Sequence, residues 1–200
     1  MLFYFALAAV AAVALAENPA EEICPAIGFL TCAPLVIGKL PEDNRLAENE
    51  KDLEKYCDVM KPYLKCVLEH GKECPNYSKS SYYQVYEQQF EIFSRTCDKG
   101  DDLRKSLLNN AKCLNEHRHH TEKKCGELLV FQDEMTKEVC EEQKRRFECA
   151  FEDIGKHCGK AASEFMRELT APLTKFLNKN CDNVQIVNID MLRSMSLGLY

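Results

Sequence analysis

Two stretches of the chain share one cysteine pattern, CDVMKPYLKCVLEHGKEC over residues 57–74 and CEEQKRRFECAFEDIGKHC over residues 140–158. The cysteines are separated by nine and eight residues in the first stretch and by nine and nine in the second. Flanking residues match as well, since Glu69 aligns with Glu152. Self-similarity of this kind is the signature of an internal repeat, and it decides how the rest of the chain is interpreted.

The twelve cysteines of the 200-residue chain extend this match in both directions. Successive offsets are 8, 25, 9, 8 and 23 in the first six cysteines and 12, 15, 9, 9 and 23 in the last six. We therefore predict two six-cysteine units, residues 17–100 and 101–181, followed by a C-terminal tail, residues 182–200. The first unit holds Cys24, Cys32, Cys57, Cys66, Cys74 and Cys97, and the second holds Cys113, Cys125, Cys140, Cys149, Cys158 and Cys181.

Residues 1–16 are almost wholly apolar and contain no charged side chain. They end in Ala14-Leu15-Ala16, the small-x-small pattern after which signal peptidase cuts. The run is shorter than the roughly 20 residues that a membrane-spanning helix needs. We therefore expect a signal peptide over residues 1–16, a mature protein that begins at Glu17, no membrane span in the mature chain, and secretion.

Secretion gives the cysteines a specific meaning, because the extracellular space is oxidising and favours disulfides. The chain has no Cys-x-x-Cys pair, the spacing that presents thiolates to a metal ion from a tight turn. An even number of cysteines in an exported chain predicts a disulfide framework, here of six bridges.

Hydrophobic residues recur at steps of three and four along almost the whole chain, which predicts an all-α fold. In the first unit we expect three helices, roughly residues 24–40, 48–70 and 80–97, with Pro62 as a kink or break in the second. In the second unit Pro172 is expected to interrupt the last helix. Asp101 or Asp102, at the junction of the units, can cap the next helix by accepting a backbone N–H.

Equal cysteine spacings on antiparallel helices let two disulfides form like the rungs of a ladder. The offset of eight residues between Cys24 and Cys32 resembles the offsets of nine and eight residues on either side of Cys66. Among the fifteen pairings that six cysteines allow, the spacing favours Cys24–Cys74, Cys32–Cys66 and Cys57–Cys97 in the first unit.

The segment His117-Arg118-His119-His120 is the strongest candidate for a metal site. His117 and His120 are three residues apart and share one face of a helix. The only further ligand in sequence reach is Glu116, and Arg118 between the histidines disfavours a cation. We therefore interpret the segment as a solvated helix surface and expect neither a metal ion nor a cofactor.

Two other features have structural interpretations. His70 and His157 are expected near the ends of the middle helices, where a positive charge suits the helix dipole. The aromatic stripe from Tyr82 to Phe93 could line a pocket for a small apolar ligand, but at helical spacing it is better interpreted as core. Asn76-Tyr77-Ser78 is a glycosylation sequon in an expected loop of an exported protein.

The sequence contains no Gly-x-Ser-x-Gly elbow, no His-Glu-x-x-His helix and no glycine-rich phosphate loop. We therefore predict a protein that is not an enzyme and that acts outside the cell by binding or as a structural component, of the haemolymph, venom, saliva or silk type. The alternatives are an extracellular carrier of a small apolar ligand and a secreted hydrolase with an unrecognised site. The formal net charge of −6 argues against nucleic acid as a partner. The expected partner is an extracellular protein or a small apolar ligand.

The spacing Cys140-x8-Cys149-x8-Cys158-x22-Cys181, with Pro172 and Leu173 before the last cysteine, resembles that of cysteine-rich, all-helical secreted proteins of arthropods and nematodes. These proteins carry domains of unknown function, and the haemolymph glycoproteins of insects are one such group. The resemblance implies secretion and a helical fold, and it brings no catalytic residues. Insect odorant-binding proteins also have a Cys-x8-Cys interval, but they need a Cys-x3-Cys pair that this chain lacks.

Overall fold

The computed structural model of the chain describes residue 28 and residues 30–40, 45–75, 77–126, 128 and 136–181. All regular structure in this part of the chain is helical, which confirms the predicted all-α class. The elements are the 3-10 turns η2 (Ala33–Leu35) and η3 (Tyr77–Lys79) and the helices α3 (Glu50–Glu73), α4 (Ser81–Thr96), α5 (Asp102–Cys125), α6 (Lys137–His157), α7 (Lys160–Leu169) and α8 (Ala171–Asn180).

Short polar side chains start the main helices by accepting backbone N–H groups that have no partner within the helix. The Ser80 hydroxyl accepts the N–H of Tyr83 at the start of α4. The Asp101 carboxylate accepts the N–H of Leu103 at the start of α5, which confirms one of the two predicted caps. Thr136 caps α6 in the same way.

The two prolines behave differently. Pro172 lies at the start of α8, so the predicted interruption of the last helix is confirmed. Pro62 lies inside α3, which continues through it to Glu73, so of the predicted kink or break the break is wrong and the kink stays a prediction. Buried side chains on both sides of the proline, Met60 and Tyr63, fix this part of α3 in the core and outweigh the lost backbone hydrogen bond.

The first predicted helix, residues 24–40, is shorter than expected at its C-terminal end. Within the described residues the chain passes into η2 and then into turns from Val36 onward. Gly38, three residues after η2, has a φ of 68°, a left-handed conformation that glycine adopts without strain and through which no helix continues.

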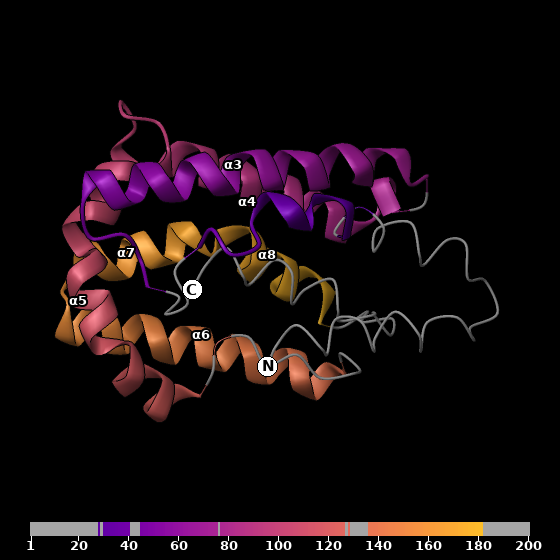
Figure 1. The fold of residues 1–200 in the computed structure, drawn as a ribbon. Coiled ribbons are helices and arrows are strands. Elements are labelled where there is room, and N and C mark those ends of the chain that lie inside the picture. Colours follow the sequence, from indigo (N-terminus) through magenta and orange to yellow (C-terminus); the bar gives the residue numbers. More distant parts are fainter. Residues whose placement is uncertain are drawn as a thin grey trace.

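The helices pack into one bundle in which α7 and α8 lie between the α3–α4 pair and α6 (Figure 1). Helix α4 of the first predicted unit packs against α5, α7 and α8 of the second. The buried apolar residues of both units accordingly belong to one continuous cluster. The two units therefore share a core.

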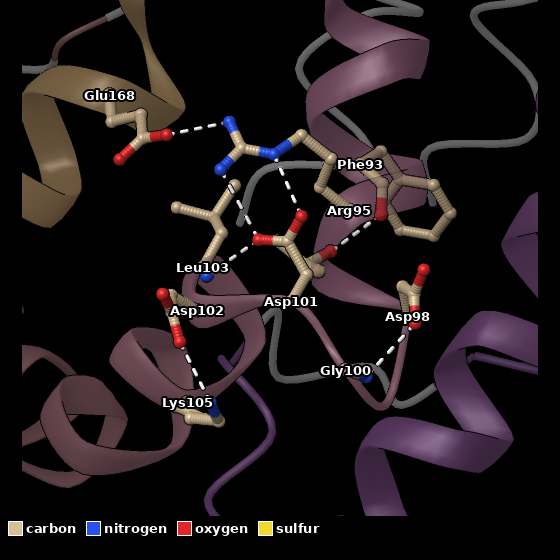
Figure 2. Close-up of polar contacts among 10 residues, drawn as sticks. Phe93, Arg95, Asp98, Gly100, Asp101, Asp102, Leu103, Lys105 and Glu168 are labelled. Atoms are coloured by element: carbon tan, nitrogen blue, oxygen red, sulfur yellow. Dashed lines mark hydrogen bonds and ion pairs between the residues drawn. The ribbon is translucent and has the colours of Figure 1, made fainter.

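Two arginines join the predicted units through ion pairs of very different burial. Figure 2 shows Arg95 of α4 between Asp101 and Glu168, with N–O distances of 2.7–3.2 Å. All three side chains of this network are partly exposed to solvent. Arg104 of α5 is almost fully buried and donates to the Glu50 carboxylate at the start of α3.

Five disulfides connect the described helices: Cys32–Cys66, Cys57–Cys97, Cys113–Cys158, Cys125–Cys149 and Cys140–Cys181. The first two are pairs favoured by the spacing. The last three join the first cysteine of the second unit to the fifth, the second to the fourth, and the third to the sixth. Cys32–Cys66 and Cys57–Cys97 follow this same order in the first unit. Cys74 is also disulfide-bonded.

Several predictions concern residues outside the described part of the chain: the signal peptide (1–16), Cys24 and its expected bridge to Cys74, the sequon residue Asn76, and the tail (182–200). None of the described helices combines the length and the apolar character needed to cross a bilayer.

Candidate functional site

A polar cluster fills the contact between α5 and α6. His117 and His120 project from α5, and Asp153 and His157 project from α6. One ligand atom from each of the four side chains lies within 4.8 Å of every other. The spacings of three residues on α5 and four on α6 place each pair on one helix face, so two packed helices bring all four together. We refer to these four residues as the histidine–aspartate cluster.

Asp153 is the centre of the cluster and is fully buried. Its Oδ2 lies 3.1 Å from Nε2 of His117, and its Oδ1 lies 3.8 and 3.7 Å from Nε2 of His120 and His157. The imidazole rings are also close to one another, with centroids 4.1 Å apart for His117 and His157. The three rings therefore surround one carboxylate.

Two further side chains of α5 hold the Asp153 carboxylate. The Thr121 hydroxyl donates to Oδ2 at 2.9 Å, and the Lys124 ammonium donates to Oδ1 at 2.5 Å. Burial acts to raise the pKa of Asp153, but the bonds from Lys124, Thr121 and His117 outweigh it and lower the pKa to about 2. The carboxylate is therefore ionised at neutral pH.

Two disulfides bracket the cluster and tie α5 to α6. Cys113–Cys158 lies at one end, with Cys158 directly after His157. Cys125–Cys149 lies at the other end, with Cys125 directly after Lys124. The distance between the helices is thus fixed covalently on both sides of the cluster, which keeps its side chains in place.

The structure changes the interpretation of the histidine-rich segment. The sequence offered only Glu116 as a further ligand, whereas the fold supplies Asp153 and His157 from another helix. Arg118, the residue that disfavoured a cation, donates to Glu122 at 2.7 Å. The signal that could have pointed to this arrangement was the Asp-x3-His spacing that ends just before Cys158.

The other candidates do not form sites. In the aromatic stripe Val85, Tyr86 and Phe93 are buried in the common core, as the sequence predicted. His70 approaches Cys32 and Cys66, but these cysteines form a disulfide and offer no thiolate to a metal ion. His157 is the last residue of α6, where the sequence placed it, but it belongs to the cluster as well.

No model of a protein family, no curated protein sequence and no solved structure matches this chain. The histidine–aspartate cluster offers three imidazole nitrogens and one ionised carboxylate, a donor set that suits divalent transition metals.

Proposed function

We propose that this chain is a secreted, non-enzymatic protein that acts by binding in the extracellular space. The observation that carries the proposal is the disulfide framework: five bridges link the described helices, and no described cysteine is free. Disulfides at this density persist in oxidising compartments. The apolar run of residues 1–16 and the resemblance to secreted helical proteins support the same compartment.

The framework also supports a role in binding. Bridges at both ends of the α5–α6 pair hold the side chains between these helices in fixed positions. A rigid scaffold of this kind favours recognition of a ligand or a partner. The absence of a recognised catalytic motif in the sequence supports a non-enzymatic role.

Export is tested by expressing the full chain in insect cells and determining the N-terminus and mass of the protein in the medium. We expect a chain that begins at Glu17, carries a glycan on Asn76 and has no thiol that reacts with iodoacetamide before reduction. The matched control replaces Ala14 and Ala16 with Phe, which removes the small residues that signal peptidase needs. The control should keep its N-terminal segment.

Retention of the wild-type chain inside the cell, or several reactive thiols in the folded protein, would contradict the extracellular assignment. Turnover of a substrate by the purified protein would contradict the non-enzymatic assignment. A native mass spectrum recorded beside a denatured, non-reduced one then detects a bound ligand or a second subunit as mass that only the native sample carries.

A further inference from the structure

We propose that His117, His120, Asp153 and His157 bind one divalent transition-metal ion, and that Zn²⁺ is the ion the site fits best. This inference deepens the proposed binding function, because it names a ligand for it. The proposed function and the metal site can be refuted independently of each other. Export and bridge formation are measured without metal, whereas metal binding is measured on the purified, oxidised protein.

The distances agree with a tetrahedral site. Zn²⁺ binds imidazole nitrogen and carboxylate oxygen at about 2.0–2.2 Å, so neighbouring donor atoms in a tetrahedron lie about 3.3 Å apart. His120 and His157 place Nε2 3.8 and 3.7 Å from Oδ1 of Asp153, whereas Nε2 of His117 lies 3.1 Å from the other carboxylate oxygen, Oδ2. Since all four donor atoms already lie within 4.8 Å of one another, small side-chain rotations complete the set.

Direct hydrogen bonding to Asp153 explains only one of the three histidines. His117 is within hydrogen-bond distance of Oδ2. The Nε2 atoms of His120 and His157 lie 3.8 and 3.7 Å from Oδ1, which is too far for a hydrogen bond. They are close enough to share an ion with the carboxylate, and a metal therefore accounts for their convergence on a buried charge.

The surroundings of the cluster match those of metal sites. The Thr121 hydroxyl donates to the Asp153 carboxylate and orients it, as hydrogen-bond donors around metal ligands commonly do. The two flanking disulfides hold the helices at a fixed separation, so little ordering remains to be done when an ion binds. Four protein donors would fill a tetrahedral site, which is the arrangement of a site that holds a metal rather than one that activates water.

Lys124 opposes the binding of a cation. Its ammonium lies 2.5 Å from Oδ1 of Asp153 and supplies the positive charge that the carboxylate needs without metal. The side chain is 45% exposed, so it can turn to solvent when an ion takes its place. Lys124 and the metal ion therefore compete, and Lys124→Met should bind the ion several-fold more tightly than the wild type.

The test uses the mature, oxidised protein without a histidine tag. Titration with Zn²⁺ at pH 7.4 by calorimetry should give one ion per chain, and Co²⁺ should give the intense visible absorption of a tetrahedral complex. We expect His157→Asn and His117→Asn each to weaken binding by ~10-fold or more. His119→Asn is the matched control, because His119 is on the same helix but 91% exposed and pairs with Glu122.

A second measurement does not depend on variants. The chain has five histidines, and in the wild-type protein Zn²⁺ should shift the imidazole resonances of His117, His120 and His157 while leaving those of His70 and His119 in place. The proposal is overturned if no ion binds, if His119→Asn weakens binding as much as His157→Asn does, or if the resonances of all five histidines move together.

Discussion

The described disulfides of the two predicted units follow the same pairing order, but the residues at equivalent positions between the bridges differ in kind. Gly28 and His117 each lie four residues after the first cysteine of their unit, and His70 and Asp153 each lie four residues after the fourth. In the first unit the backbone at Gly28 packs directly on His70, and an added Cβ would lie 2.8 Å from the His70 Cβ. In the second unit the equivalent positions belong to the histidine–aspartate cluster.

This difference separates what the framework needs from what it does not. In the first unit Gly28 packs against His70 at this position. The disulfide framework therefore does not require a buried charge there. In the second unit a buried carboxylate, three histidines and a lysine occupy it, at a desolvation cost that hydrogen bonds and ion pairs must offset. Because the disulfide framework does not need the histidine–aspartate cluster for its stability, we expect the cluster to serve a specific function.

The largest effect should come from removing equivalent disulfides. Replacing Cys57 and Cys97 with Ala, or Cys140 and Cys181 with Ala, opens loops with sequence separations of 40 and 41 residues. In the chain-entropy model each loop corresponds to about 4 kcal/mol of unfolding free energy. Because the loops are nearly equal, chemical denaturation should give losses that agree within about 1 kcal/mol. If only one of the two double variants lost unfolding free energy, the equivalent disulfides would not stabilise the two units equally.

The next effect compares the ion pair whose arginine is buried, Arg104, with the network whose arginine is partly exposed, Arg95. Arg104→Ala should lower the free energy of unfolding by about 3 kcal/mol, because it removes a buried side chain that joins α5 to α3. Arg95→Ala, in the network of Figure 2, should cost about 1 kcal/mol or less, because that network is solvated. Equal losses in urea unfolding would contradict this ranking.

Two glycines, each three residues before the fifth cysteine of its unit, should change stability with opposite signs when replaced by Ala. A Cβ at Gly71 would lie 2.9 and 3.0 Å from the rings of Tyr83 and Tyr77, so Gly71→Ala should destabilise the fold by about 2 kcal/mol. A Cβ at Gly155 would meet Ser163 at an ordinary 3.6 Å, so Gly155→Ala should stabilise its helix by up to about 1 kcal/mol. Thermal unfolding of both variants checks this, and destabilisation of similar size in both would contradict it.

The smallest effect concerns acid. The hydrogen bond from Arg95 and that from the Leu103 N–H lower the pKa of Asp101 below its ordinary value of 3.8. The folded state therefore binds a proton less readily than the unfolded state, and the stabilisation is present above pH 3.8 and lost as pH falls below it. Asp101→Asn can still cap α5. Its urea midpoint should fall less steeply than that of the wild type between pH 5 and 2.5, and parallel curves would contradict this.

Local patterns in the sequence predicted much of the fold. The start of α4 at Ser80 and of α5 at Asp101 could be predicted because a cap needs only a side chain and the next turn of backbone. The break before Pro172 could be predicted for the same reason. The continuation of α3 through Pro62 could not, because it depends on packing of Met60 and Tyr63 against other helices.

The histidine–aspartate cluster shows where prediction from sequence ends. His117 and His120 were recognisable as a pair because their spacing lies within one helix. Asp153 is one of 32 acidic residues, and its spacing to His157 becomes informative only once α6 is placed beside α5. Its role emerges only when α6 packs on α5, and that long-range contact is fixed by Cys113–Cys158 and Cys125–Cys149.

The central claim, that one disulfide scaffold occurs twice in this chain, is tested most directly by mapping the bridges of the secreted protein. Non-reduced proteolysis followed by mass spectrometry should find Cys24–Cys74 beside the five described pairs, which gives the same pairing order in both halves. A bridge that joins a cysteine of residues 17–100 to one of residues 101–181 would contradict the claim.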